Sequence, residues 1–367
     1  MQVLGALIRF TFMRLKKSHF FAVLAGLIIV ASFAFSFSSL FGQMGSRINE
    51  NASEYQASQN ALVVYDSYAK IPAAIQASYK NLQSQLNQVA GVLADDQMEH
   101  GSSFSQLDLS LRRTQLKQFA YRHHIPVRNS LSYPQVQARI ALDHYYLSHG
   151  RNENSHIRTL ADVLSNWTGL LLTAFSLFCA IIAAAVGSIS DTRKSAFKGL
   201  PIKNRLYTIA NFLATAAITL CSLVFSSVLV ALSALLFGAR LTLCKIIFLS
   251  FDRFQAINYW LVFALILLTS LILSLLFSLL GRIVEQFTPV NYFFGIGFGL
   301  LFSLPANIFG ILSLLNPQQI LSGDAGFIIG LHTNLLPIYY VIVLVLIIVS
   351  SLVLSLLTNF KKGGRLS

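Results

Sequence analysis

The chain has 367 residues, of which 55% are hydrophobic and 11% are charged. Because soluble domains carry about 25% charged residues, this composition excludes an ordinary soluble enzyme and indicates a polytopic membrane protein. The net charge is +13, yet segment 43–165 contains eleven Lys/Arg and ten Asp/Glu. The excess positive charge therefore lies in short segments beside apolar runs, which is typical of membrane topology and not of a nucleic-acid-binding face.

The first 18 residues mix apolar side chains with Arg9, Arg14, Lys16 and Lys17. The pattern predicts an amphipathic helix over 1–18 that lies in the inner membrane interface. A basic flank of a signal anchor is the alternative. The apolar run that follows is too long for the core of a cleavable signal peptide, so 19–41 is predicted as the first transmembrane helix.

Segment 43–165 is predicted as an extracellular, mainly helical domain. Ser132 before Pro134 indicates a helix start, and Gly150 indicates its end. A further helix is expected to run from His156 directly into the second span. The segment lacks the alternating pattern of β-strands. Six of its apolar residues repeat at the 4-3-4-3-4 spacing of a heptad seam, namely Ile75, Tyr79, Leu82, Leu86, Val89 and Leu93.

Five further apolar segments reach the length of about 20 residues that crosses a bilayer. None of the six predicted spans contains Asp, Glu, Lys or Arg. The predicted fold class is therefore an all-α integral membrane protein with six transmembrane helices. Segment 167–358 would hold helices two to six and a cytoplasmic loop at 189–206, and 359–367 would be a basic cytoplasmic tail. The five later spans are 167–188, 208–236, 256–280, 289–313 and 336–358.

Orientation follows from Lys and Arg in the short flanking segments. Thirteen lie on one side, whereas the short loops of the other side hold only Arg240, Lys245 and Arg253. Both termini are therefore expected in the cytoplasm. Trp167 and Trp260 fall at predicted outer ends, where interfacial anchors are common.

The three cysteines lie in or near apolar runs, and none lies in the long polar segment. This distribution argues against a disulfide framework and against a cysteine zinc site. We expect Cys179, Cys221 and Cys244 to face lipid or to pack between helices.

The sequence lacks the motifs of several enzyme classes. It has no Gly-Lys dipeptide and hence no Walker A loop, and neither H-E-x-x-H nor G-x-S-x-G occurs. We expect no catalytic or cofactor-binding residue in this chain. Spans without charge also disfavour ion-coupled transport.

Six of the eight histidines lie in the polar segment 43–165. Adjacent residues such as His123 and His124 point in different directions on a helix, and no Cys or carboxylate spacing supports a metal site. Histidines that are solvated or that lie in an interface are the simpler interpretation.

The segment between spans two and three is short, basic and partly apolar. Residues 191–199 can form two helical turns that Gly199 closes and Pro201 prevents from continuing. The segment is either a loop that only fixes topology or a short helix that docks in a partner's groove. The docking residues would be Asp191, Arg193, Lys194, Phe197, Lys198, Gly199, Leu200 and Pro201.

A second unusual segment follows span five. Pro305 should interrupt that helix near the outer surface. The apolar stretch that continues to Asn316 and Pro317 is too short to cross the membrane, so we expect an external re-entrant piece.

Both segments resemble those of type-2 ABC exporter permeases. In that family a charged short helix precedes a Leu-Pro-Ile/Val turn and a basic pair, and here Leu200, Pro201 and Ile202 are followed by Lys203 and Arg205. The family also breaks span five near a proline and then places Asn-Pro, as in the second segment. Two features depart from the family. The loop has a single acidic residue where several glutamates are common, and the external domain is larger than in the smaller members.

The resemblance implies a permease subunit of an ATP-driven exporter in the prokaryotic cytoplasmic membrane. Two such subunits, identical or related, would enclose a path through the lipid for a hydrophobic or amphiphilic cargo, such as a peptide or bacteriocin, a lipid-linked molecule or a drug. A separate cytoplasmic ABC ATPase dimer would bind ATP and Mg and dock on the short basic helices. No cofactor, metal or nucleic acid is expected on this chain.

Two other functions remain open from the sequence. The chain could be a membrane sensor or assembly protein whose external domain binds a ligand or partner. It could also be a channel or flippase that works without an ATPase. Deleting residues 50–155 should abolish all function of a sensor, whereas an exporter could keep its coupling to the ATPase. Phe197→Asp should leave the activity of a channel or flippase intact, whereas it should uncouple an exporter.

Overall fold

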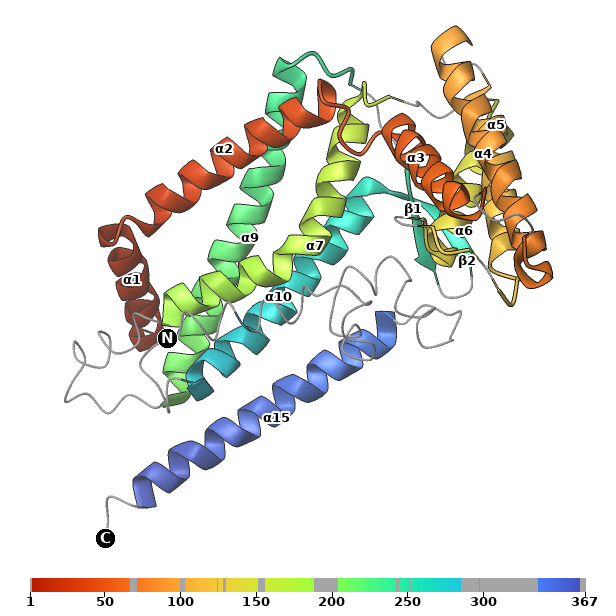
Figure 1. Ribbon diagram of the computed structural model, residues 1–367. Helices are drawn as coiled ribbons and strands as arrows, with labels where there is room; N and C mark the ends of the chain where they lie inside the picture. Colours follow the sequence, from red (N-terminus) through yellow and green to blue (C-terminus); the bar gives the residue numbers. More distant parts are fainter. Residues whose placement is uncertain are drawn as a thin grey trace.

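The computed structural model describes most of the chain and gives a bundle of long apolar helices beside a smaller helical domain (Figure 1). The described residues are 2–66, 71–99, 103–123, 125–127, 130–150, 156–187, 204–241, 245–250, 253–284, 297 and 336–363.

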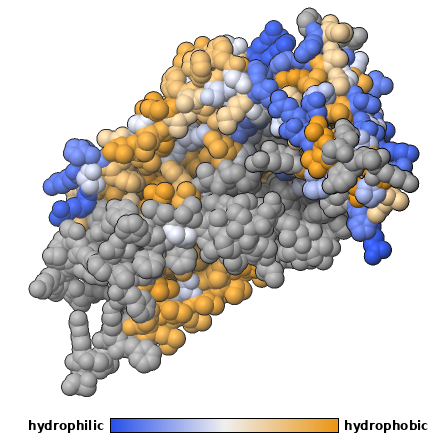
Figure 2. Space-filling model, in the orientation of Figure 1, coloured by the Kyte–Doolittle hydropathy of each residue, from blue (hydrophilic) through white to orange (hydrophobic). Residues whose placement is uncertain are grey.

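Three long helices form the centre of the bundle and pack against one another: α7 (Leu160–Gly187), α9 (Asn204–Leu236) and α10 (Tyr259–Val284). Around them, α2 (Phe20–Leu40) packs on α9, and α15 (Leu336–Gly363) packs on α10. The short α1 (Gln2–Lys17) lies against the start of α9. Apolar side chains cover much of the visible surface of the bundle, as expected of helices in lipid (Figure 2).

Within the described residues, four helices are long and apolar enough to cross a membrane. Their apolar segments are Phe20–Leu40, Arg205–Leu236, Trp260–Ile283 and Tyr339–Leu357. A fifth span, α7, counts if its halves Leu160–Leu171 and Ser176–Gly187, which meet at 60°, form one broken span. The multi-pass membrane class is thus confirmed. Six spans are not, because the predicted span 289–313 lies outside the described residues apart from Gly297.

The described part of the predicted helical domain contains four helices between α2 and α7. They are α3 (Arg47–Asp66), α4 (Ala73–Glu99), α5 (Phe104–Gln118) and α6 (Tyr133–Ser148). Figure 1 places them together at one end of the bundle. Of the heptad seam in α4, Tyr79, Leu82 and Val89 are buried, while the other three are partly exposed.

The predicted limits of α6 are confirmed. Ser132 caps its start, and the backbone N–H of Ser132 donates to Gln135 Oε1 at 2.9 Å in a capping box. The helix ends before Gly150, whose φ of +61° is the left-handed conformation that glycine adopts without steric cost. The start predicted at His156 for the next helix was four residues early, because α7 begins at Leu160. The Thr159 hydroxyl caps that start by accepting from the Asp162 N–H at 3.2 Å.

A two-stranded hairpin departs from the predicted all-α class. Strands β1 (Lys245–Ser250) and β2 (Arg253–Asn258) pair antiparallel, with Lys245 opposite Asn258, and lie against α6. The predicted fourth span is corrected at its start, because residues 256–258 belong to β2. Both strands are short and contain some β-branched or aromatic residues. Their pairing gives hydrogen-bond partners to backbone groups that would bond to water in a loop.

The interfacial role predicted for Trp167 is also wrong. Its side chain is 7% exposed, contacts Phe35 edge-to-face and donates its indole N–H to Ser227 Oγ at 3.2 Å. Trp167 therefore packs between helices. Trp260, whose side chain is 59% exposed, stays a predicted interfacial anchor.

Candidate functional site

The predicted docking and re-entrant residues all fall outside the described residues. For the docking helix, these are Asp191, Arg193, Lys194, Phe197, Lys198, Gly199, Leu200 and Pro201, and for the re-entrant piece they are Pro305, Asn316 and Pro317. The structure does describe the two helix ends that border segment 188–203, which are Gly187 of α7 and Asn204 of α9.

Both of these helix ends lie in hydrophobic clusters that include residues of α1. Leu7 of α1 is fully buried against Tyr207 and Ala210, in the first turns of α9. Leu15 of α1 packs with Val186 in the last turn of α7. The helix predicted as interfacial thus shares hydrophobic clusters with both borders of the basic segment, at the end of the bundle away from the four-helix domain (Figure 1).

Small polar side chains, not charges, fill the contact between α2 and α9. The only buried side chains of α2 are Ser32, Ser36 and Ser39. Ser36 Oγ lies 2.7 Å from Ser233 Oγ and also donates to the Val230 carbonyl at 3.2 Å. Small residues allow helix backbones to approach closely, and their hydroxyls add interhelical hydrogen bonds in lipid.

The strongest electrostatic feature lies in the four-helix domain. The Arg112 guanidinium is fully buried, and its Nη1 donates to both carboxylate oxygens of Glu54 at 2.8 and 2.7 Å. Its Nη2 donates to Asn51 Oδ1 at 2.6 Å and lies 3.2 Å from Asp108. Arg47 forms a second ion pair with Asp108. This buried network joins α3 to α5, because Asp108 and Arg112 come from α5 and the others from α3.

These charges fix the ionisation of the network. Burial favours the neutral form of Asp108, but the positive charges of Arg47, Arg112 and Arg139 outweigh it and hold the pKa of Asp108 well below its usual range. Burial likewise lowers the pKa of Arg112, but the carboxylates of Asp108 and Glu54 outweigh this effect and raise that pKa. Asp108 and Arg112 therefore stay ionised at neutral pH.

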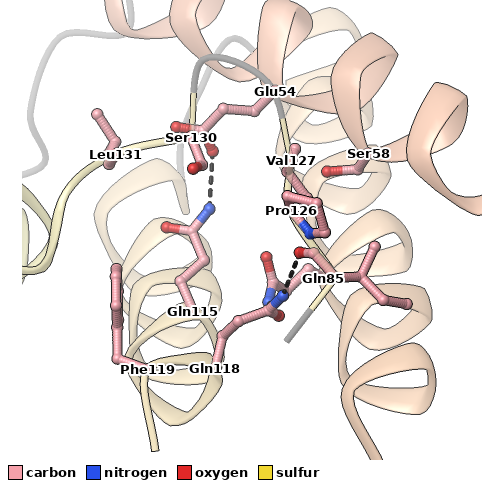
Figure 3. A pocket seen from close by; sticks show the side chains of 11 residues that line it. Glu54, Ser58, Gln85, Gln115, Gln118, Phe119, Pro126, Val127, Ser130 and Leu131 are labelled. Carbon is pink, nitrogen blue, oxygen red and sulfur yellow. Dashed lines mark hydrogen bonds between the residues drawn. The ribbon is translucent and has the colours of Figure 1, made fainter. Parts of the chain in front are cut away.

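A partly polar pocket of about 200 Å³ lies next to this network, between α3, α4, α5 and residues 125–127, 130 and 131 (Figure 3). Gln115 donates to Glu54 Oε2 at 2.9 Å, and Gln85 donates to Gln118 Oε1 at 2.7 Å. Phe119 adds an apolar surface. Because Arg112 already neutralises Glu54, the pocket suits an uncharged ligand with hydrogen-bonding groups and an apolar part.

Sequence reasoning missed this pocket. A signal was present in α4, where Ser78, Asn81 and Gln85 recur at three- and four-residue spacing and are all buried. A polar stripe parallel to an apolar seam indicates a second buried helix face, and a buried polar face requires hydrogen-bond partners. The partners come from α5, including Gln118 and the Thr114 carbonyl.

Of the histidines in the predicted domain, His156 makes the closest contact with a carboxylate among the described residues. Its Nε2 lies 2.9 Å from Asp96 Oδ2, which links the end of α4 to the segment leading into α7. Among the described residues, no group of three or more His, Cys, Asp or Glu is arranged to hold a metal ion.

Of the cysteines, Cys179 is buried and packs with Leu273, Phe277 and Tyr339, while Cys221 is exposed on α9. These positions match the packing and lipid-facing roles predicted for them. Cys244 lies outside the described residues.

Comparisons of the chain with known protein families, with curated proteins and with solved structures found no match.

Proposed function

We propose that this chain is the permease subunit of an ATP-driven exporter in the prokaryotic cytoplasmic membrane, with both termini in the cytoplasm. The proposal rests on the resemblance of segments 191–206 and 303–321 to type-2 ABC exporter permeases. A separate ATPase dimer would bind ATP and Mg, and a second permease subunit would complete a path for a hydrophobic or amphiphilic cargo.

One structural observation supports this proposal most directly. The two helix ends that border the basic segment 188–203 each share a hydrophobic cluster with α1, and the cluster at the α7 end also includes Phe20, Phe21 and Leu24 of α2. A force applied by a partner to that segment would therefore reach α7, α9, α1 and α2 together. Packed helices transmit such displacements because their interiors are dense and not continuously deformable.

The test is gentle purification of the full chain from its native membrane, with mass spectrometry of the proteins that co-purify. We expect a soluble protein with a Walker A motif, which is lost on Phe197→Asp and retained on Ser18→Asp. The control places the same charge at the exposed bend after α1, on the same predicted side of the membrane. A stable preparation without any ATPase would contradict the proposal and leave the basic segment as a topology signal.

A second candidate function is a membrane sensor or assembly protein whose external domain binds a ligand. The polar pocket beside Glu54 favours this function. Replacing residues 50–155 by a short linker would separate the candidates. A sensor would lose all activity, whereas an exporter would keep nucleotide-dependent coupling to its ATPase.

A further inference from the structure

One face of α2 is packed along only half of its length. Residues Phe21, Ala25, Ile28, Ser32, Ser36 and Ser39 follow at 4-3-4-4-3 spacing and thus form one stripe. The three serines at its C-terminal end are fully buried, and Ser32 and Ser36 donate to backbone carbonyls of α9. The three residues at its N-terminal end are only partly buried, although they lie on the same face.

The helices therefore diverge below Ser32 and leave an open apolar groove of about 400 Å³. The α9 wall presents Ala217, Cys221 and Phe225, which follow at four-residue spacing and are all exposed. Phe12 of α1 closes one end and stacks on Phe21, with ring centroids 5.9 Å apart and planes at 12°. Figure 1 shows the same divergence of α2 from α9 toward α1.

Basic side chains follow Phe12 in the last turn of α1. Arg14, Lys16 and Lys17 are exposed in the last turn of α1, and the chain then bends at His19, which has φ +58°. Residues 2–40 contain no Asp or Glu. Figure 2 shows hydrophilic side chains at this bend, next to the hydrophobic surface of α2. The positive charge there has no acidic neighbour on its own two helices.

The combination identifies the chemistry of the occupant. An apolar groove that opens at a membrane-facing surface accepts an alkyl chain, and exposed Lys and Arg at the interface attract a phosphate headgroup. A zwitterionic lipid would fill the groove equally well but would be attracted less by the basic turn. An anionic phospholipid satisfies both parts at once.

We propose that the groove between α1, α2 and α9 binds one acyl chain of an anionic membrane phospholipid, with the headgroup on the basic last turn of α1. The occupant is a lipid of the surrounding membrane and not a transported cargo. The proposal requires only that these helices lie in a membrane, so it stands or falls separately from the exporter function.

The first experiment measures lipid retention by the full-length protein in mild detergent, with native mass spectrometry. The probes are phosphatidylglycerol and phosphatidylcholine with matched acyl chains. We expect preferential retention of phosphatidylglycerol, and a loss of that retention on Ala217→Trp, which fills the groove. Val30→Trp adds the same side chain to the outer face of α2, where Val30 is 68% exposed, and should retain the lipid.

A charge variant tests the headgroup without altering the groove. Arg14→Gln with Lys17→Gln should weaken phosphatidylglycerol binding by about 30-fold, since each basic side chain near an anionic lipid contributes about fivefold. Phosphatidylcholine binding should be unchanged. Equal retention of the two lipids by the wild-type protein would overturn the proposal. Equal retention by the Ala217→Trp and Val30→Trp variants would overturn it too.

Cys221 supplies a readout that does not depend on recovery of the complex. In a Cys244→Ser background, Cys221 is the exposed thiol among the described cysteines, because Cys179 is buried. Its reaction with a lipophilic maleimide should be several-fold slower in nanodiscs of phosphatidylglycerol than in nanodiscs of phosphatidylcholine. The difference between the two reaction rates should vanish in the Arg14→Gln/Lys17→Gln variant. Equal rates in both lipids for the parent protein would show that no lipid occupies the groove.

Discussion

Ser36 of α2 and Ser233 of α9 are 197 positions apart in the sequence, and their hydroxyl oxygens lie 2.7 Å apart at a fully buried helix contact. The contact lies in the packed half of α2, and the proposed lipid groove opens between Ser32 and α1. The first prediction concerns this contact.

Ser36→Leu should destabilise the protein although it makes α2 more hydrophobic. The larger side chain has no room at a fully buried position and forces the two backbones apart, which costs about 1–3 kcal/mol. Ala34→Leu makes the same kind of increase at an exposed position of the same helix and should have little effect. Thermal unfolding in detergent measures both, and equal melting temperatures for the two variants would show that the contact is loose.

Arg112→Met should destabilise the four-helix domain strongly. It removes the partner of Glu54 and one partner of Asp108, and an uncompensated buried carboxylate costs about 3–5 kcal/mol. Arg139→Gln breaks the ion pair between Arg139 and Glu50, which are 24% and 33% exposed. Because exposed pairs contribute little, the loss of stability should be less than about 1 kcal/mol. Protease protection of residues 47–148 would report the difference. A similar loss of protease protection in the Arg112→Met and Arg139→Gln variants would mean that the Arg112 network is not buried in solution.

The stability of this domain should fall steeply only at acidic pH. Because the pKa of Asp108 is lowered in the folded state, its ionised form contributes stability above the unfolded value of about 3.9. That contribution is lost as the pH falls from about 4 toward the lower folded pKa. The free energy of unfolding can be measured from pH 7 to pH 2.5. The contribution of Asp108 to it should be nearly constant above pH 5. The Asp108→Asn variant should be less stable at pH 7, and its stability should fall less steeply at acidic pH. An unchanged fall in stability at acidic pH would show that Asp108 is not the group responsible.

Gly45→Ala should destabilise the junction between α2 and α3, whereas Gly91→Ala should not. Gly45 has φ +80°, and an added Cβ would lie 2.8 Å from Asn166 Nδ2. The substitution therefore combines backbone strain with a clash at the contact in which Asn166 donates to the Met44 carbonyl. At Gly91, within α4, nothing lies within 4 Å of an added Cβ. Alanine there should stabilise the helix by about 0.5–1 kcal/mol, and the two melting temperatures should move in opposite directions.

Much of the helical layout could be predicted from the sequence because the signals are local. A run of apolar residues long enough to cross a bilayer identified α2, α9, α10 and α15 to within a few residues. Ser132, Pro134 and Gly150 marked both ends of α6 through capping and backbone conformation. The hairpin at 245–258 was missed because its strands are short and their stability comes from pairing and from contact with α6, which no local pattern contains.

The charge of the chain and the positions of its apolar runs determined by themselves that this is a multi-pass membrane protein, since a bilayer admits only long apolar helices or closed barrels. Only the tertiary structure decided which polar residues meet. Arg112 and Glu54 are 58 positions apart, and Ser36 and Ser233 lie in different spans. Such contacts depend on how helices cross, and crossing is set by side-chain shape on both partners at once, so neither the buried ion network nor the groove beside α1 could be read from one helix alone.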